Sequence, residues 1–187
     1  MSRLRIISGS AKGRKLHMVP GDSTRPVTDR VKEALFNILG SEVAGCTFLD
    51  LFAGTGSVGI EALSRGAHFA QFYDSHPKAI ETIQKNLSLT GLSENAGVLQ
   101  VDALSAITRK ADRRFDYIYI APPQYHQLWE KAVLTLDANA DWLVEDGWVV
   151  VQIDPQEYLE LELHNLSEFD SRKYSNTMLV FYERIAP

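Results

Sequence analysis

Three glycines have the spacing of a loop that can bring its backbone close to a bound nucleotide. Gly54, Gly56 and Gly59 form a G-x-G-x-x-G pattern between a strand-like run (47–52) and a helix-like run (57–66). The missing side chains permit a tight turn, close approach of a ligand and close packing of the helix. The pattern predicts a nucleotide-binding loop, although a glycine turn chosen only for its geometry would have the same sequence.

A carboxylate stands at the end of each of the first three predicted strands. Asp50 lies just ahead of the glycine loop, where a carboxylate suits an ammonium group better than a pyrophosphate. Asp74 is placed to accept hydrogen bonds from ribose hydroxyls, or to act as the negative charge that begins the next helix. Asp102 could reach a purine amino group or cap a helix. Together the three acids describe a slot for a nucleoside with an amino-acid-like tail, which S-adenosylmethionine fits better than a dinucleotide.

The fourth predicted strand ends abruptly in a pair of prolines. Ala121-Pro122-Pro123-Gln124-Tyr125 follows the run 115–121, and proline cannot donate to a sheet ladder. The carbonyls of residues 121 and 122 are therefore expected to be rigid and unpaired. Such acceptors can hold an amine beside a methyl donor, and Tyr125 can stack on the planar ring that carries the amine. The alternative is a strand terminator followed by a tyrosine of the core.

An alternation of strands and helices from Thr47 onward would place these residues at one edge of a sheet. The predicted strands are 47–52, 68–74, 96–102, 115–121, 147–154, and a final pair near 160–166 and 174–183. The helices between them are predicted at 57–66, 77–91, shortly after 102, and 128–140. The pattern is typical of a doubly wound, mostly parallel α/β sheet whose last two strands form a hairpin. Ligands on such sheets bind beyond the carboxyl ends of the strands.

The beginning of the chain is basic, whereas the remainder is acidic. Residues 1–32 carry eight Lys or Arg against two Asp, a balance of +6, and the rest carries 11 basic against 22 acidic residues, a balance of −11. Segments 3–8 and 13–19 predict a small basic hairpin. A helix capped by Thr28 and ended by Gly40 should follow, with Lys32 on its polar face. This charge asymmetry favours a polyanionic partner, and a solvated, frayed terminus is the alternative.

Length and composition indicate one ordinary globular domain. The 187 residues, 45% of them hydrophobic, suffice for a real core. No apolar stretch reaches the roughly 20 residues that cross a bilayer, the first residues lack a signal-peptide core, and the single Cys46 excludes an intrachain disulfide. The five histidines lack metal-ligand spacing. We therefore expect a cytoplasmic protein with neither a metal nor a membrane partner.

Over nearly its whole length the sequence resembles the RsmD family of bacterial methyltransferases, which modify the exocyclic amine (N2) of one guanine in small-subunit ribosomal RNA. The resemblance is carried by the runs RIISGSAKGRKL, RPVTDRVKEALFNIL and LDLFAGTGSVGIEALSRGA, the acidic end of the second strand, and the proline pair. It implies a Rossmann-like class I S-adenosylmethionine-dependent methyltransferase, with a mostly parallel seven-stranded sheet, helices on both faces and a small N-terminal β-hairpin. Residues 1–27 would be an RNA-contacting extension, and residues 28–187 the methyltransferase domain.

The resemblance also implies roles for individual residues. The cofactor-binding set would be Asp50, Phe52, Ala53, Gly54, Thr55, Gly56, Gly59, Asp74, Asp102 and Ala103, with Asp74 on the ribose and Asp102 on the adenine. The segment Arg25–Thr28 would close over the site. RNA would be held by Arg3, Arg5, Lys12, Arg14, Lys15, Arg25 and Arg30. The catalytic segment would be Ala121, Pro122, Pro123, Gln124 and Tyr125, and the partner 16S rRNA or the 30S subunit, approached by a monomer.

The catalytic segment departs from the family pattern, which is Asp or Asn, Pro, Pro and then an aromatic residue. Here Ala121 replaces the acid or amide, Gln124 replaces the aromatic residue, and Tyr125 comes one position late. Losing an acceptor that holds the reacting amine costs on the order of 10²–10³ in rate. Methyl transfer from a sulfonium depends mainly on positioning, however, because the amine loses its proton after the attack. The carbonyl of Ala121 or Pro122, or the amide oxygen of Gln124, is therefore a candidate acceptor.

Other functions share parts of this pattern. A protein that binds the cofactor and RNA without catalysis would explain Ala121. An N-methyltransferase acting on DNA or on a protein amide would share the proline pair. A nicotinamide-dependent oxidoreductase would explain the run from Gly54 to Asp74, but neither the basic hairpin nor the proline pair.

Overall fold

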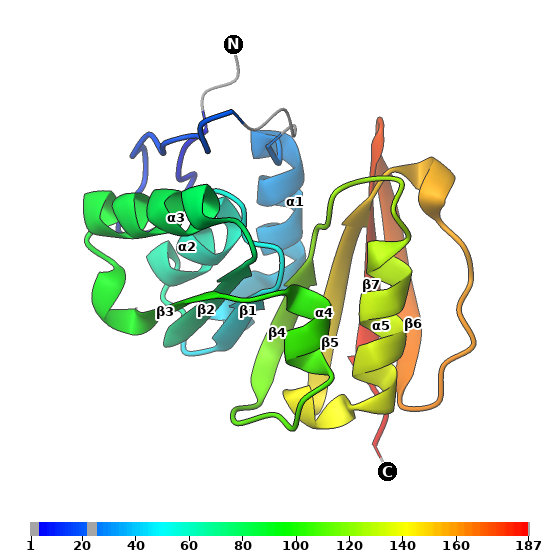
Figure 1. The fold of residues 1–187 in the computed structure, drawn as a ribbon. Coiled ribbons are helices and arrows are strands. Elements are labelled where there is room, and N and C mark those ends of the chain that lie inside the picture. The colour runs from blue at the N-terminus through cyan, green and yellow to red at the C-terminus, as the bar shows by residue number, and fades with distance from the viewer. Residues whose placement is uncertain (1–3, 22–25, 187) are drawn as a thin grey trace. The chain divides into compact units, whose positions relative to one another are not determined.

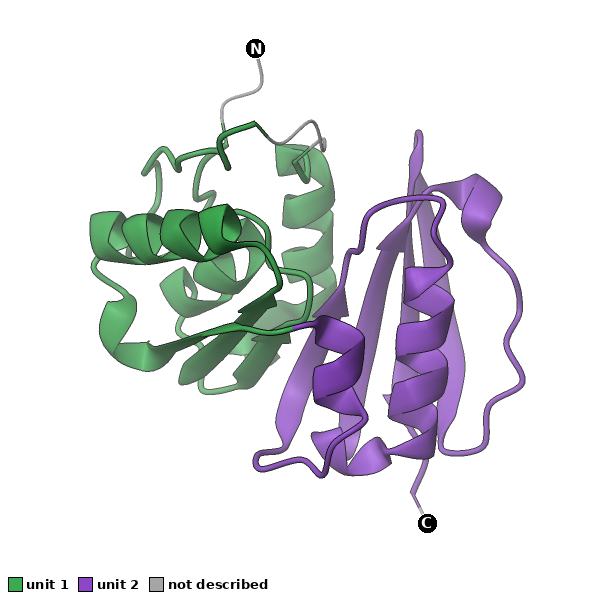
Figure 2. Ribbon diagram, in the orientation of Figure 1, with its two compact units in different colours: residues 1–101 green, residues 102–187 purple. Residues whose placement is uncertain are grey.

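The computed structural model describes residues 4–21 and 26–186, and the chain divides into two compact units (Figure 2). Unit 1 comprises residues 1–101 and unit 2 comprises residues 102–187. The seven strands form a mostly parallel sheet, in the order β3-β2-β1 in unit 1 and β4-β5-β7-β6 in unit 2. The seven-stranded, mostly parallel architecture expected from the sequence is thus confirmed.

Unit 1 contains three parallel strands and the helices that connect them (Figure 1). The strands are β1 (Thr47–Asp50), β2 (Phe69–Asp74) and β3 (Ala96–Gln100). Between them run α2 (Ser57–Ser64), α3 (Pro77–Thr90) and the short turn η2 (Ser93–Asn95). Because all three strands run in one direction, their carboxyl ends meet at one edge, as the registers Asp50↔Phe72 and Asp74↔Gln100 show.

Helix α1 (Asp29–Leu39) begins and ends where the sequence predicts, and η1 (Gly40–Val43) follows it. The Thr28 hydroxyl accepts a hydrogen bond from the Val31 N–H at 3.3 Å, and Gly40 ends the helix with φ +61°. The prediction was wrong for Lys32, which is fully buried instead of lying on a polar face. A buried lysine requires a charged partner, and Glu61 of α2 lies 3.2 Å from its Nζ.

Unit 2 holds the other four strands. They are β4 (Phe115–Ile120), β5 (Leu143–Ile153), β6 (Leu166–Tyr174) and β7 (Thr177–Arg184). The helices are α4 (Ala103–Ile107) and α5 (Leu128–Ala138), with short turns η3 (Ala140–Trp142) and η4 (Pro155–Glu157). β4 and β5 are parallel, whereas β7 is antiparallel to both β5 and β6, so the predicted terminal hairpin is confirmed.

The first strand of that hairpin was predicted in the wrong place. Leu159, Leu161 and Leu163 alternate with glutamates, which mimics a half-buried strand, yet this segment lies outside the sheet. The strand actually formed, β6, is strongly polar and pairs only with β7. An edge strand can be polar because much of its side-chain surface faces water, and its sequence therefore carries little hydrophobic pattern.

Within the described residues, no helix is long and apolar enough to cross a membrane. The same part of the chain contains no group of three or more His, Cys, Asp or Glu that could hold a metal ion.

Candidate functional site

The loop between β1 and α2 turns sharply at its first two glycines. Gly54 and Gly56 have φ values of +56° and +78°, which side chains rarely tolerate. The Gly56 N–H donates to the Ala53 carbonyl at 2.8 Å and closes the turn, while the Ala53 N–H donates to the Tyr73 carbonyl at 2.9 Å and ties the loop to β2. A side chain built on Gly54 would meet no atom within 4 Å, so the backbone there faces open space that a ligand can approach.

The third glycine serves packing. A Cβ atom on Gly59 would lie 2.3 Å from the Phe72 ring of β2. The sequence prediction that one glycine allows close helix packing is therefore confirmed at this position. Gly59 brings the first turn of α2 against the sheet, and through that turn it sets the position of the loop.

Asp50 lies buried beneath the first turn of α2. Its side chain is 2% exposed, and its Oδ2 accepts a hydrogen bond from the Gly59 N–H at 3.1 Å. Burial raises the pKa of Asp50 to about 7; the hydrogen bond from Gly59 opposes this effect, and the negative charge of Asp74 adds to it. At about pH 7 the protonated and the charged forms of this carboxyl are therefore similarly populated, and a cationic group beside it would favour the charged form.

Asp74 braces the glycine loop from the end of β2. Its Oδ2 accepts a hydrogen bond from the Gly54 N–H at 2.9 Å, and its Oδ1 accepts one from the His76 N–H at 2.9 Å. A carboxylate has about four acceptor positions, so Asp74 keeps capacity for ligand hydroxyls. Its second predicted role, as a negative charge before α3, agrees with its bond to His76 and with Pro77 opening that helix.

The remaining predicted cofactor residues lie on or near these strand ends. Phe52 and Thr55 are half-buried, and Ala53 is buried. Asp102 caps α4, with its Oδ1 accepting a hydrogen bond from the Ser105 N–H at 2.8 Å, and Ala103 is the buried first residue of that helix. Asp102 belongs to unit 2, and its neighbour Val101 donates to the Asp74 carbonyl at 2.9 Å in unit 1.

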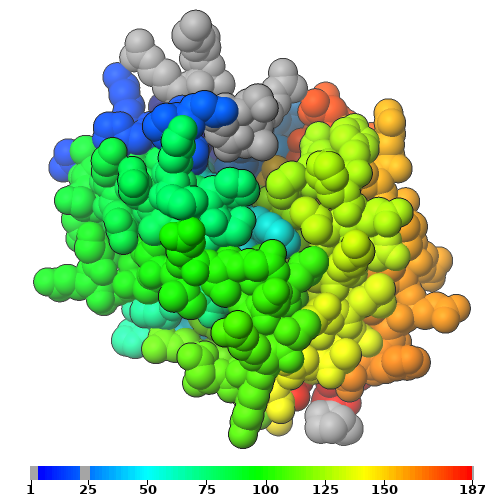
Figure 3. Space-filling view, in the orientation of Figure 1, coloured from blue at the N-terminus to red at the C-terminus, as the bar shows by residue number. Residues whose placement is uncertain are grey.

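Residues 4–21, which we call the arm, are docked on unit 1. Instead of two predicted strands the arm has one isolated antiparallel bridge between Arg5 and Lys15, supported by bonds from the Ile6 N–H to the Arg14 carbonyl and from the Leu16 N–H to the Leu4 carbonyl, both 2.9 Å. Its apolar residues Leu4, Ile6, Ala11 and Leu16 are buried. In the space-filling view the arm covers the surface beside α3 (Figure 3). A frayed terminus is therefore excluded for these residues.

Glu61 of α2 fastens the first half of the arm. Its carboxylate accepts hydrogen bonds from the Ile7 N–H at 2.9 Å and the Ser8 N–H at 3.0 Å, and it pairs with Lys32 at 3.2 Å and Arg65 at 2.9 Å. Burial lowers the pKa of Lys32, and the nearby Glu61 carboxylate opposes that effect. The sequence does not reveal this role of Glu61, because nothing local distinguishes a buried glutamate from an exposed one.

Ser64, at the end of α2, fastens the turn of the arm. Its hydroxyl donates to the Ser8 carbonyl at 2.6 Å and accepts from the Ala11 N–H at 2.9 Å. Gly9 has φ +86°, and a Cβ atom there would lie 1.8 Å from the Ser64 carbonyl oxygen. The two backbones meet at this point, which only glycine permits.

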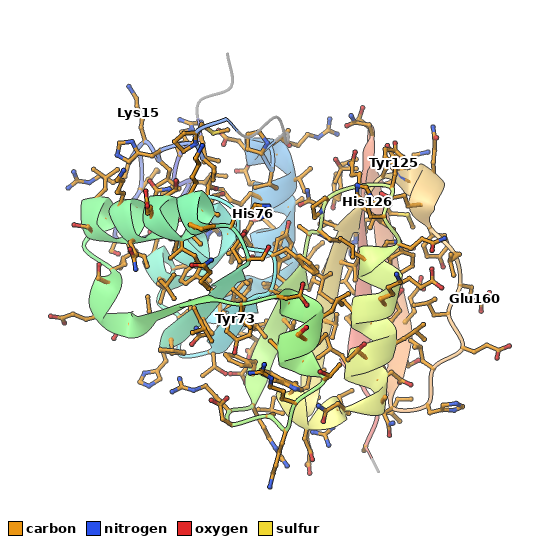
Figure 4. The ribbon with its side chains drawn as sticks, viewed as in Figure 1. Lys15, Tyr73, His76, Tyr125, His126 and Glu160 are labelled. Carbon is orange, nitrogen blue, oxygen red and sulfur yellow. The ribbon has the colours of Figure 1, made fainter. Side chains whose placement is uncertain are left out.

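The predicted RNA-binding residues fall into three groups: exposed residues, one exposed residue in an ion pair, and two that the structure does not describe. Lys12, Arg14, Lys15 and Arg30 are exposed, and Lys15 projects from the arm into solvent (Figure 4). Arg5 is also largely exposed but pairs with Asp29 at 2.8 Å. Arg3 and Arg25 lie outside the described residues. Of the segment predicted to close over the site, residues 26–28 are described, and Thr28 is the cap of α1.

In unit 2 the proline pair follows directly after β4, as predicted. Ile120 is the last residue of the strand, Ala121 and Pro122 are half-buried, and Pro123 begins the exposed part of the loop. Gln124 is exposed, and its side chain has no hydrogen-bond partner among the described residues, so its amide oxygen is available as an acceptor.

Tyr125 is held at the surface by two carboxylates. Tyr125, labelled in Figure 4, has φ +64° and is 64% exposed. Its N–H donates to Glu157 Oε1 at 2.7 Å, and its hydroxyl donates to Asp154 Oδ2 at 2.9 Å. The hydrogen bond to Asp154 raises the pKa of the Tyr125 hydroxyl. The alternative of a core tyrosine is wrong, because the ring is exposed. Glu157 Oε2 is buried without a hydrogen-bond partner among the described residues, a feature that the sequence does not reveal.

The sheet, the glycine loop and the acidic strand ends define a Rossmann-like class I S-adenosylmethionine-dependent methyltransferase fold, which solved structures share. The family model described as "Conserved hypothetical protein 95" matches residues 4–183. The chain belongs to this family, which includes the RsmD methyltransferases.

Named relatives match nearly the whole chain. A Bacillus subtilis protein named "Putative rRNA methyltransferase YlbH" is 42% identical over 97% of this chain and 99% of its own length. The Escherichia coli "Ribosomal RNA small subunit methyltransferase D" is 32% identical over 98% of this chain and 91% of its own length. The solved structure of "Putative methyltransferase yhhF from Escherichia coli" has a TM-score of 0.86 at 32% identity, covering 97% of this chain and 98% of that one.

Proposed function

We propose that this protein transfers a methyl group from S-adenosylmethionine to the exocyclic N2 amine of one guanine in 16S rRNA, within the assembling or assembled 30S subunit. The observation that carries the proposal is the exposed basic arm docked on α2 and α3, the two helices beside the glycine loop. A cofactor loop alone requires no such arm. The names of both full-length relatives support ribosomal RNA as the substrate, and the name of the Escherichia coli relative supports the small subunit.

The loop side of unit 1 fits the cofactor. Gly54 faces open space, Asp74 keeps acceptor capacity for ribose hydroxyls, and Asp50 offers a carboxylate whose charge an ammonium group would favour. Asp102 is assigned to the adenine, since one of its oxygens caps α4 and the other remains available. When bound, the cofactor supplies an electrophilic methyl group on a sulfonium.

The arm supplies the contacts to the RNA backbone. Lys12, Arg14, Lys15 and Arg30 are exposed cations, suited to phosphate oxygens. Such contacts fix the position of the RNA, while the choice of nucleotide is made at the reacting base. The acidic remainder of the chain would repel RNA elsewhere, so binding is concentrated on the arm.

The loop after β4 receives the base. We assign stacking of the extruded guanine to Tyr125, because its ring is exposed yet fixed through its N–H and its hydroxyl. The carbonyls of Ala121 and Pro122 accept hydrogen bonds from the amine and aim its lone pair. The amine loses its proton after the new N–C bond forms, so no strong base is required at this position.

A catalytically silent protein that binds the cofactor and RNA is the second candidate. Ala121 favours it, because the family pattern has an acid or an amide at this position. The exposed Gln124 side chain provides an acceptor on the same loop, which is why we prefer an active enzyme.

The test is transfer of a labelled methyl group from S-adenosylmethionine to small ribosomal subunits from cells that lack this gene, followed by nuclease mapping. Naked rRNA and DNA are assayed in parallel, together with the Ala121→Asp variant. Label on N2 of one guanine is the expected result. Absence of label on every substrate, with cofactor binding intact and transfer restored by Ala121→Asp, would establish the silent binding protein instead.

A further inference from the structure

Asn86 of α3 connects the arm to the glycine loop. Its side chain is fully buried, and its Oδ1 accepts a hydrogen bond from the His17 N–H at 2.7 Å. Its Nδ2 donates to the His17 carbonyl at 3.1 Å and to the Thr55 carbonyl at 2.9 Å. Thr55 lies between the two glycines that turn the loop, so one side chain bonds the backbone of both segments.

Both donors and the acceptor of the Asn86 amide form hydrogen bonds. Each of its two N–H donors has one carbonyl partner, and its oxygen has one amide partner. Because the group is buried, a lost partner leaves a polar atom without water to replace it. Displacing the arm therefore removes two of the three bonds and leaves Asn86 free to turn away from Thr55.

A second connection joins the arm to the opposite end of the loop. Lys32 Nζ donates to the Arg5 carbonyl at 2.6 Å and to the Ser57 hydroxyl at 3.5 Å. Ser57 is the first residue of α2 and follows Gly56 directly. The arm is thus bonded through intermediates to residues 55 and 57, on either side of Gly56.

We propose that Asn86 is a positioning residue that couples the two binding events, so that RNA held by the arm and cofactor held by the loop each strengthen binding of the other. The ordering of Thr55 by the cofactor fixes the Asn86 amide, which in turn fixes the arm at His17. Such coupling is reciprocal by thermodynamic necessity. The inference rests on the proposed function, since it requires that the arm binds RNA.

The test measures the affinity of an rRNA fragment carrying the mapped target, with and without saturating S-adenosylhomocysteine, at one salt concentration. In the wild-type protein we expect S-adenosylhomocysteine to tighten RNA binding about fivefold or more, the lower end of ordinary coupling. In Asn86→Asp the ratio should fall to about one, because the variant keeps the size and the acceptor but turns a second oxygen toward the two carbonyls.

Thr82→Val is the matched control. Thr82 is a buried residue of the same helix, and its hydroxyl donates only to the Lys78 carbonyl within α3. In Thr82→Val the ratio of RNA affinities with and without S-adenosylhomocysteine should equal that of the wild-type protein. If any buried substitution on α3 disturbed the coupling, the ratio would fall in Thr82→Val as much as in Asn86→Asp. Thermal unfolding of all three proteins checks that they are folded.

The outcomes separate this inference from the proposed function. RNA that is bound and methylated, with an affinity that S-adenosylhomocysteine leaves unchanged in the wild-type protein, overturns the coupling alone. RNA that is neither bound nor methylated refutes the proposed function. Should Asn86→Asp fail to fold, hydrogen exchange of the His17 amide in the wild-type protein decides the matter. Slower exchange with S-adenosylhomocysteine supports the coupling, and unchanged exchange contradicts it.

Discussion

The loop after β1 and the loop after β4 both leave the carboxyl end of a parallel strand, but they are built on opposite principles. The first uses Gly54 and Gly56, whose positive φ values cost little, and is braced by Asp74. The second begins with two prolines and then places Tyr125 and Gln127, which are not glycines, at φ +64° and +55°. Side chains are disfavoured at the turn of the first loop because of its positive φ values, whereas the second loop is held by hydrogen bonds that single substitutions can remove.

This contrast predicts that Gly56→Val has the largest effect of the substitutions considered. Its φ of +78° disfavours a β-branched side chain, whose Cβ would lie 3.3 Å from Ile60 and Ile83. We expect affinity for S-adenosylmethionine to fall by about 10³-fold or more, roughly 4 kcal/mol, in calorimetric titration. Gly91→Ala is the control, because Gly91 has φ +72° in open space at the end of α3. Normal cofactor affinity in Gly56→Val would refute the slot.

The second prediction concerns the carboxyl beneath the first loop. Asp50 has its pKa raised from 3.8 to about 7 in the folded protein, so the unfolded chain gives up this proton at lower pH than the folded chain does. The folded state consequently loses stability as pH rises from about 4 to 7. Asp50→Asn removes that loss. The free energy of unfolding of the variant, relative to that of the wild-type protein, should therefore be about 2–4 kcal/mol higher at pH 8 than at pH 4.

Denaturant unfolding of both proteins between pH 4 and pH 8 measures this difference. A stability difference that stays constant across the range would contradict the raised pKa. Asp50→Asn should also weaken cofactor binding above pH 7, where the wild-type carboxyl is charged and can pair with an ammonium group.

For the second loop, Tyr125→Ala should lower kcat/KM for the RNA substrate by about ten- to 100-fold, since stacking on the target base is lost. Tyr125→Phe keeps the ring and removes only the hydrogen bond to Asp154, so a loss of less than about fivefold is expected. Steady-state methyl transfer provides both values. Equal losses in the two variants would show that the anchoring bond, and not the exposed ring, matters.

The smallest effect is expected on the arm, where no single cation dominates. Lys15→Glu should weaken RNA binding about fivefold and reduce the salt dependence of binding by about one counterion. Cofactor affinity measured without RNA should be unchanged, because Lys15 is exposed and lies on the arm, away from the loop backbone. Parallel loss of both affinities would contradict the assignment of this residue to RNA.

Local signals predicted most of the fold and one part of the site. Thr28 and Gly40 marked the ends of α1 because capping chemistry is written in neighbouring residues. The glycine loop and the strand-ending prolines were likewise found from local patterns. Asp50 was assigned from its position ahead of the loop, but its hydrogen bond to Gly59 could not be predicted, because that bond depends on how α2 packs.

The connections of the arm could not be read from the sequence at all. Lys32, Glu61, Ser64 and Asn86 occupy helical positions where a polar residue is ordinarily solvated. Their partners are backbone groups of residues 5–17, up to 69 positions away in the chain. Such distant partners decide whether a polar side chain is buried. The position of the strongly polar strand β6 was missed for a related reason, because β6 forms a strand by pairing with β7 and not through a hydrophobic pattern of its own.

The contact of Gly9 with the Ser64 carbonyl has a consequence for protein engineering. An arm moved onto another methyltransferase would dock only where the recipient helix leaves a carbonyl free to accept from the arm, as the Ser64 carbonyl accepts from the Ser10 N–H at 2.8 Å beside Gly9. A working graft would have to carry the outer face of α2 and the middle of α3 together with the first 21 residues. The arm and the faces of α2 and α3 that it contacts thus form one structural unit, which cannot be exchanged at the boundary after residue 21.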